Sequence, residues 1–157
     1  MGNLGRASGG GIVQNSHGDW VSGYARAIGY TTSVTTELWA LRDVINLCIE
    51  LCLTNVLIEL DAKIVVNMLQ KNEEILNTND VILADCKEGL QKIPRVQIQH
   101  CYREANKCAD ALGRRGALLS QDFVIFQSPQ LMWHCWLALM LWALCMSIFA
   151  PLFLFCS

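Results

Sequence analysis

The chain has 157 residues, enough for one domain with a substantial hydrophobic core. Its net charge of −2 excludes a globally basic protein, so any contact with nucleic acid has to come from a local basic patch. The eight cysteines show no Cys-x-x-Cys pair and no zinc-site spacing with histidine, which argues against a disulfide scaffold or a structural zinc protein. We expect a reducing compartment, the nucleus or the cytoplasm, and no signal peptide, since the Gly-rich start of the sequence has no apolar run.

The amino-terminal part predicts a loop followed by a hairpin. Residues 1–11 are Gly-rich and predict a loop, whereas residues 12–14 and 20–30 predict two strands. The polar cluster 15–19 between them has the composition of a turn. His17 lies in that turn and is interpreted as a solvated residue without a chemical role.

A long amphipathic helix is predicted next, from Ser33 as its N-cap to about Leu53. Glu37 lies in its first turns, where the helix dipole stabilises a carboxylate. Its position on the apolar side of the helix is less usual and leaves a functional role open. The expected buried stripe consists of Leu38, Leu41, Val44, Ile45, Cys48, Leu51 and Cys52.

The middle of the chain predicts a strand followed by two helices. Residues 56–60 form a compact apolar strand, and Asp61 follows at once. Asp61 is either the N-cap of the next helix, residues 62–71, or a site residue at the carboxyl end of a strand, where α/β sites collect. The second helix is predicted over residues 80–93 and ends at a proline. The expected buried residues of the two helices are Ile64, Val65, Met68, Leu69, Val81, Leu83, Ala84 and Leu90.

The stretch 97–119 changes from strand to helix. Alternation of Val96 and Ile98 with two glutamines predicts a half-buried strand that ends near His100. After Tyr102 the apolar period becomes helical, and Asp110 sits inside this helix beside an apolar pair. The expected buried residues are Ala105, Cys108, Ala109, Leu112 and Gly116. The whole order of elements predicts an α/β fold, a mixed sheet flanked by helices, closing by about residue 126.

Charge is uneven along this stretch. Between residues 95 and 115 there are five basic and two acidic residues, a local charge of +3. Such a patch can contact a phosphate backbone, although a solvated helix face with mixed charges is the simpler interpretation. The basic residues are Arg95, Arg103, Lys107, Arg114 and Arg115.

Composition changes abruptly near residue 128. Residues 131–157 contain no Asp, Glu, Lys or Arg, and the apolar run 131–150 is long enough to cross a bilayer as a helix. The sequence therefore divides into a domain, residues 1–127, and a hydrophobic tail, residues 128–157. The tail is interpreted either as a membrane anchor or as a mistranslated segment.

Three motifs taken together resemble the ribonuclease H family, most closely its plant retrotransposon-derived branch. His100, Arg103, Glu104, Asn106 and Asp110 have the spacing H-x-x-R-E-x-N-x-x-x-D of the family's last motif. The segments TTELWALRD and IELDAKIVV are similar to two earlier motifs. The resemblance covers roughly residues 2–127.

This resemblance implies a ribonuclease H-like fold and cleavage of the RNA strand of an RNA–DNA hybrid by two Mg²⁺ ions. Glu37, Asp61 and Asp110 match the metal-binding carboxylates, and His100 matches the histidine that assists proton transfer or product release. A histidine that ends a strand is more often structural. The residues expected to contact nucleic acid are Asn3, Arg103, Asn106, Lys107, Arg114 and Arg115, in a protein that acts as a monomer.

The family's fourth carboxylate has no match. In the family, an Asp-Gly pair on the first strand precedes a G-N-x-G loop, and here that loop is similar to Gly2–Gly5 with no strand before it. No acidic residue precedes Asp19. We expect a sheet that lacks its first strand, neighbouring strands with unpaired edges, and little or no hydrolysis. The alternatives are a non-catalytic nucleic-acid-binding module and a degenerate gene fragment.

Overall fold

The structure is a computed structural model that describes residues 5–70, 78–102, 106–128 and 152–156. Its strands are β1 (Gly5–Gln14), β2 (Trp20–Thr31), β3 (Asn55–Leu60), β4 (Arg95–His100), β5 (Phe123–Phe126) and β6 (Leu152–Cys156). Its helices are α1 (Ser33–Glu50), α2 (Lys63–Gln70), α3 (Thr78–Gln91) and α4 (Lys107–Gly116). The predicted order of hairpin, helix, strand, two helices, strand and helix is confirmed.

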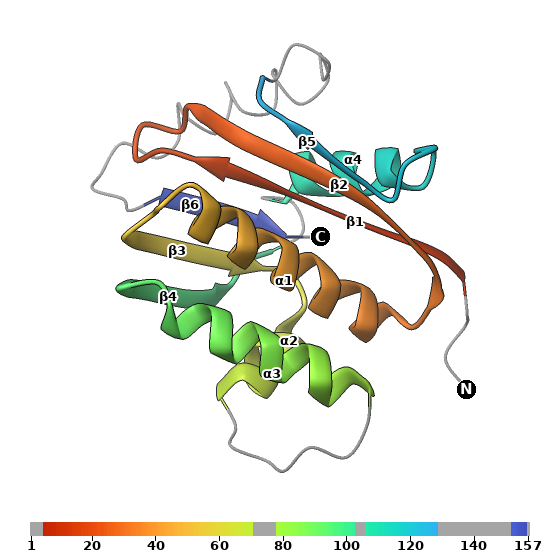
Figure 1. Cartoon of the computed structure of the whole chain (residues 1–157), viewed down its shortest axis with the longest axis horizontal. Coiled ribbons are helices and arrows are strands. Elements are labelled where there is room, and N and C mark those ends of the chain that lie inside the picture. The colour runs from red at the N-terminus through yellow and green to blue at the C-terminus, as the bar shows by residue number, and fades with distance from the viewer. Residues whose placement is uncertain (1–4, 71–77, 103–105, 129–151, 157) are drawn as a thin grey trace.

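The strands form one mixed sheet in the order β4-β3-β6-β1-β2-β5. β1 and β2 pair antiparallel as a hairpin, and β3 pairs parallel with β4. Figure 1 shows α1 crossing one face of the sheet with α3 beside it, while α4 lies on the opposite face. The predicted α/β fold, a mixed sheet flanked by helices, is confirmed.

The hydrophobic core has two parts, one on each face of the sheet. Alternation along the strands sends Val13 and Tyr24 toward α1, and their neighbours Ile12 and Ala25 toward α4. β3 is buried on both faces, which explains why its sequence is an almost continuous apolar run.

The Gly-rich segment predicted as a loop is a strand instead, because β1 begins at Gly5. A Cβ on Gly10 would lie 2.7 Å from the carbonyl carbon of Leu112 and would also meet the backbone nitrogen of Gly113. A Cβ on Gly116 would lie 2.5 Å from the carbonyl oxygen of Arg26. Glycine is therefore required where α4 lies directly against β1 and β2. The loop prediction for residues 1–11 is wrong at Gly10, because its glycine serves this close approach rather than a flexible loop.

α1 begins one residue earlier than predicted and ends sooner. Thr32, not Ser33, is the N-cap, and its side chain accepts a hydrogen bond from the backbone N–H of Thr35 at 3.2 Å. Leu51 and Cys52 are exposed rather than part of the buried stripe. Cys52 has φ 54°, a left-handed conformation that ends the helical pattern.

The buried faces of α2 and α3 also differ from the prediction. Ile64 is 55% exposed and Val81 is 57% exposed. The residues that enter the core are Val65 and Val66 of α2, and Ile82 and Cys86 of α3. The prediction for α4 is confirmed at Cys108, Ala109, Leu112 and Gly116, which are all buried. Ala105 lies outside the described residues.

β6 lies between β1 and β3, where unpaired edges were expected. It runs antiparallel to β1 and parallel to β3, and it pairs with both along its length. Five residues of the segment predicted as a separate tail therefore belong to the middle of the sheet. Among the described residues, no helix is long and apolar enough to span a membrane. The apolar run 131–150, on which the anchor prediction rests, lies outside them, so that alternative stays a prediction.

Candidate functional site

The candidate site lies at the carboxyl ends of the two parallel strands β3 and β4. Leu60 and His100 are partners in the last position of this pair. The backbone N–H of Cys101 then donates to the carbonyl oxygen of Leu60 at 2.9 Å. Asp61 follows Leu60 directly, so the pairing holds Asp61 beside the end of β4, the edge of a parallel sheet where functional groups collect.

Three carboxylates act electrostatically on the thiol of Cys101. The pKa of this thiol is raised to about 12, first by burial and then by the negative charges of Glu59, Asp61 and Glu37. These three acids, called the carboxylate cluster below, belong to β3, to the turn after it and to α1. That Glu37 and Asp61 share one site stays a prediction.

Glu59 is the residue of this cluster that the sequence reading missed. It lies on β3, is 8% exposed, and accepts a hydrogen bond from the side-chain nitrogen of Gln99 at 2.6 Å. Burial raises the pKa of Glu59, and the hydrogen bond from Gln99 opposes the shift. An acid in the middle of the apolar run VLIEL was the available signal, because an unexplained charge in a buried strand is rare.

We expect Glu59→Gln to raise stability by about 1 kcal/mol at pH 8, because the buried charge is removed while an acceptor for Gln99 remains. The folded-state pKa of Glu59 lies above its ordinary value, so the wild-type protein loses stability as pH rises through it. The gain should therefore shrink as pH falls. Urea unfolding at pH 8 and pH 4.5 measures both effects.

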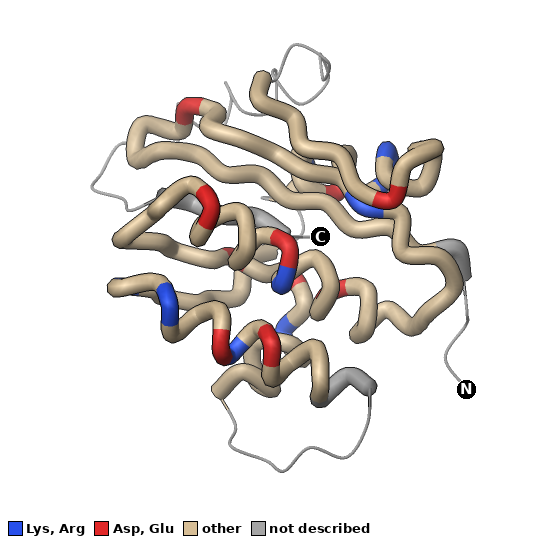
Figure 2. The backbone as a smooth tube through the Cα atoms, viewed as in Figure 1, with Lys and Arg blue, Asp and Glu red and all other residues tan. Residues whose placement is uncertain are grey.

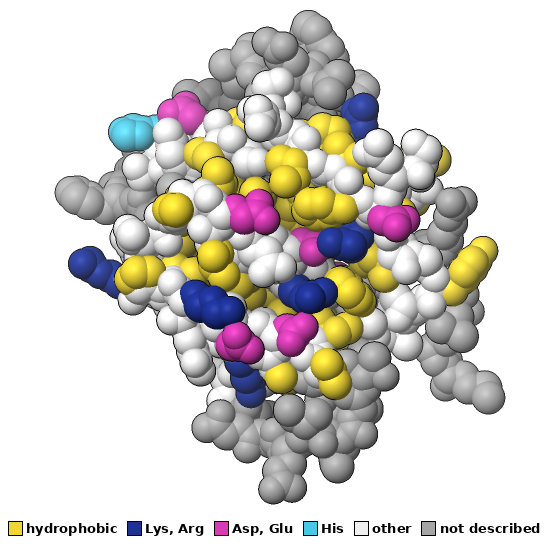
Figure 3. Space-filling view, viewed as in Figure 1, with side chains coloured by type: hydrophobic (Ala, Val, Ile, Leu, Met, Phe, Trp, Pro, Cys, Tyr) yellow, Lys and Arg dark blue, Asp and Glu magenta, His cyan; other side chains and the backbone are white. Residues whose placement is uncertain are grey.

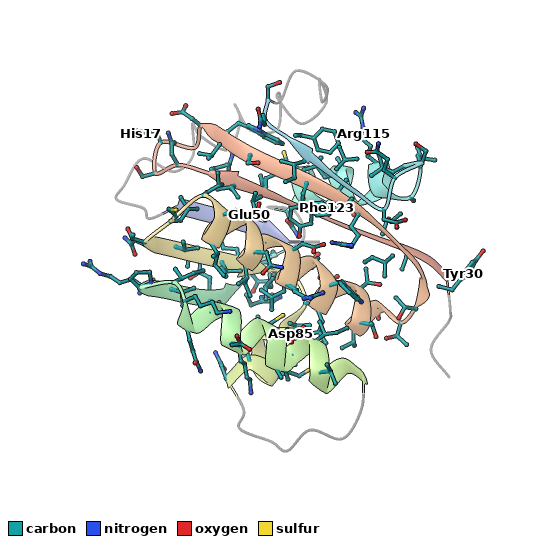
Figure 4. The ribbon with its side chains drawn as sticks, in the orientation of Figure 1. His17, Tyr30, Glu50, Asp85, Arg115 and Phe123 are labelled. Carbon is teal, nitrogen blue, oxygen red and sulfur yellow. The ribbon has the colours of Figure 1, made fainter. Side chains whose placement is uncertain are left out.

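Glu50→Gln is the matched control for that experiment, because Glu50 is exposed near the end of α1 (Figure 4). It should leave the free energy of unfolding unchanged at both pH values. A Glu59→Gln protein that is less stable than wild type at pH 8 would show that the charge of Glu59 is needed by the fold.

Asp110 lies on the opposite face of the sheet from α1, in the first turn of α4. Its Oδ2 is 2.9 Å from Nη2 of Arg114, an i,i+4 ion pair in which Arg114 is 80% exposed and Asp110 28%. Cys108 of α4 and Cys101, the residue after β4, belong to the same hydrophobic cluster on this face of the sheet. The side chain of Asp110 itself is paired with a basic residue of its own helix.

The predicted nucleic-acid contacts divide into three groups. Lys107 and Arg114 are exposed on α4, and the guanidinium of Arg115 lies 5.4 Å from the ring centroid of Phe126. Asn106 is fully buried, so the prediction that its side chain meets a phosphate is not supported. Its backbone carbonyl instead accepts the N–H of Asp110 at 3.0 Å. The predictions for Asn3 and Arg103 lie outside the described residues.

The two histidines with sequence interpretations both lie on the surface. His100 is exposed at the end of β4, and its ring packs edge-on against Tyr102 with centroids 5.5 Å apart. Its place beside Leu60 keeps it close to the carboxylate cluster, and a chemical role for it stays a prediction. His17 is exposed and projects from the turn between β1 and β2, as expected for a solvated turn residue (Figure 4).

The carboxylates do not form a ready Mg²⁺ centre. Carboxylate oxygens are suitable ligands for Mg²⁺, but no three His, Cys, Asp or Glu side chains in the described ranges are grouped so that they could hold a metal ion. Asp110 is paired with Arg114, and the charges of the other acids act on a buried thiol. Assignment of Glu37, Asp61 and Asp110 as metal ligands therefore stays a prediction.

The face that carries α1 and α3 is not a uniform basic surface. Figure 2 shows acidic and basic residues close together along the backbone of this face, and Figure 3 shows their side chains next to one another, with hydrophobic side chains around them. Two of these pairs are Arg42 with Asp85 at 3.4 Å and Lys92 with Glu88 at 2.9 Å. The three basic residues of α4 are the more concentrated group, and they lie on the other face of the sheet.

Comparison with known proteins places these features in a family. The model of the reverse transcriptase-like family matches residues 2–116. A protein of Arabidopsis thaliana whose name describes it as a ribonuclease H protein is 32% identical over 125 residues, which is 80% of this chain and 20% of that protein. The chain thus spans about a fifth of the length of this curated relative.

Solved structures show the same fold. Ribonuclease H1 from the archaeon Halobacterium salinarum matches with a TM-score of 0.68 and 22% identity, over 74% of this chain and 89% of that one. The N-terminal ribonuclease H domain of a Mycobacterium tuberculosis protein gives 0.64 and 20%, over 74% and 87%. A ribonuclease H1 named LC11, solved with an RNA/DNA hybrid, gives 0.65 and 23%, over 74% and 89%.

Proposed function

Because the chain belongs to the reverse transcriptase-like family and has the ribonuclease H fold, we propose that it binds RNA–DNA hybrids and cleaves their RNA strand weakly or not at all. Helix α4 is the observation that carries this proposal. It presents basic side chains to solvent, and one of them, Arg114, forms an ion pair with Asp110, the carboxylate that the family would use for hydrolysis. The plant retroelement origin agrees with the Arabidopsis relative and is part of the same proposal.

Binding follows from the basic side chains of α4. Lys107 is exposed, Arg114 is exposed and paired with Asp110, and the guanidinium of Arg115 lies over the ring of Phe126. Side chains of this kind contact phosphates. The neutralisation of phosphates by such side chains releases counterions, so affinity should fall steeply with salt. This term needs no metal.

Weak hydrolysis follows from the acids. Two-metal cleavage needs carboxylates that converge on both ions, and in this chain the carboxylate of Asp110 is paired with Arg114 instead. A hybrid that approaches α4 would compete with Asp110 for Arg114. Binding of the hybrid to Arg114 would then release the carboxylate of Asp110. Slow cleavage at high Mg²⁺ is consistent with this coupling.

The test uses the full chain and a labelled RNA–DNA hybrid, with EDTA or Mg²⁺. Affinity should be the same in EDTA, and no more than slow RNA cleavage should appear in Mg²⁺. The double variant Lys107→Gln/Arg115→Gln should reduce the slope of log affinity against log salt by up to about 2. Lys92→Gln on α3 is the control and should leave this slope unchanged.

Two results would contradict the proposal. Binding that disappears in EDTA would show that a metal, not α4, holds the hybrid. Rapid cleavage that Asp110→Asn abolishes would show a working metal centre and an active nuclease.

A further inference from the structure

Among the described residues, β6 is the strand that joins the two halves of the sheet. One half consists of β4 and β3, and the other of β1, β2 and β5. β6 pairs with β3 on one side and with β1 on the other. Figure 1 shows it in the centre of the sheet, with its carboxyl end at the same side as the carboxyl end of β3.

The candidate site is divided between these halves. Asp61 follows β3, whereas α4 with its basic residues packs against β1 at Gly10. Cys156 of β6 pairs with Leu60 on one side and with Gly11 on the other. The end of β6 thus lies between the residue before Asp61 and the residue next to Gly10.

The presence of β6 sets the distance between β3 and β1. Neighbouring strands lie about 4.8 Å apart, so β6 holds β3 and β1 about 10 Å apart. Without it, the halves either leave a gap with two unpaired edges or close by one strand spacing. Both changes are far larger than the tolerance of about 0.5 Å within which binding groups work.

We propose that residues 152–156 are a positioning element that sets the spacing between the carboxylate cluster and α4, so that the hybrid-binding surface forms only when this strand is in place. The strand comes from the same chain. Its effect on hybrid binding rests on the proposed function, whereas its place in the sheet does not.

The sequence of the strand fits this position. Helices cover both faces of the sheet, and β6 contacts α1 on one face and α4 on the other. A strand covered on both faces has a continuous apolar sequence rather than an alternating one. Residues 152–156 read LFLFC, with no charged or strongly polar residue.

A disulfide tests the placement without any assay of activity. Gly11 and Cys156 are antiparallel partners, and such partners have Cα atoms about 4.5–5.5 Å apart, within the range that a disulfide spans. Gly11→Cys should therefore form an intramolecular disulfide with Cys156 on mild oxidation, identified by peptide mapping. Gly11→Cys/Cys156→Ser is the control and should form none. If Gly11→Cys does not fold, Gln14→Cys/Phe153→Cys tests the same pairing.

A distance measurement tests the positioning role. Spin labels on Gln97 of β4 and on Leu118, just after α4, both exposed, report the separation of the two halves. Leu154→Pro, in the centre of β6, should broaden or shift this distance and, in the unlabelled protein, lower hybrid affinity at least tenfold. Leu154→Val should leave both as in the wild type. Ile125→Pro in the edge strand β5 is the control, and it should leave the distance unchanged.

Each result decides the proposal. A folded Gly11→Cys protein without the predicted disulfide, or with one that links two chains, would overturn the placement of β6. An unchanged distance in Leu154→Pro would overturn the positioning role. If the wild-type protein does not bind the hybrid but Gly11→Cys forms the disulfide, only the proposed function is contradicted.

Discussion

Gly10→Ala is expected to destabilise the protein by about 3 kcal/mol and to displace α4 from the sheet. The added methyl group would lie 2.7 Å from the carbonyl carbon of Leu112 and against the backbone nitrogen of Gly113, and backbone atoms cannot turn aside as a side chain can. Overpacking of this kind typically costs about 1–3 kcal/mol. Because Asp110 and Arg114 are on this helix, hybrid affinity should fall with stability. Urea unfolding and hybrid titration measure the two effects.

Gly9→Ala is the matched control, since Gly9 is the next residue along β1 and faces α1. Its added methyl group would lie 3.3 Å from Cβ of Ala40, a close contact that a small shift relieves. We expect a change of less than about 1 kcal/mol and unchanged hybrid affinity. Equal losses in the two variants would show that the contact between β1 and α4 is not specially tight.

Arg26→Met is expected to destabilise the protein by about 3–5 kcal/mol at pH 7, the usual cost of breaking a buried ion pair. Arg26 donates through Nε to Oδ2 of Asp43 and through Nη2 to Oδ1, the latter at 2.8 Å. Asp43 is 4% exposed, so the variant would leave a buried carboxylate without its main partner. The guanidinium of Arg26 also stacks 4.7 Å from the ring centroid of Phe123.

The loss of stability in Arg26→Met should depend on pH, because it comes from the charge of Asp43. Burial raises the pKa of Asp43, while the hydrogen bond and charge of Arg26, and to a lesser extent the charge of Arg42, lower it. Without Arg26 this pKa rises further, and a carboxyl group with a raised folded-state pKa costs stability as pH rises through that pKa. The difference from wild type should therefore be largest at neutral pH and shrink as pH falls.

Arg42→Met is the control for this experiment. Arg42 also stacks on Trp39, at 5.0 Å, but its ion pair with Asp85 at 3.4 Å is partly exposed. We expect a loss of less than about 1 kcal/mol. Stability curves for Arg26→Met and wild type that stay parallel between pH 4 and pH 8 would argue against the charge of Asp43 as the cause.

The order of elements and most strand positions could be predicted because they follow hydrophobic periodicity. The helix around Asp110 is the clearest case, since Cys108, Ala109, Leu112 and Gly116 repeat with helical spacing and all are buried. The segment around Gly10 could not be predicted in this way. Glycine contributes no hydrophobic periodicity. The role of Gly10 depends on its contact with α4, which lies about a hundred residues later in the sequence.

The candidate site could be predicted in part. Glu37 was singled out by its position on the apolar side of its helix and Asp61 by its position directly after a strand. The charges of both act on the thiol of Cys101. Glu59 was missed because a single charge in a strand has no spacing to recognise. The pairing of Asp110 with Arg114 is a matter of side-chain geometry, which sequence spacing permits but does not specify.

The late position of β6 in the chain has a consequence for folding during synthesis. Val13 and Leu154 are partners across nearly the whole sequence, so the centre of the sheet stays open on the ribosome until the last partner has emerged. Contacts between such distant residues slow folding, and open strand edges invite association with other chains. We therefore expect the nascent protein to depend on chaperones more than a domain whose central strand is made first.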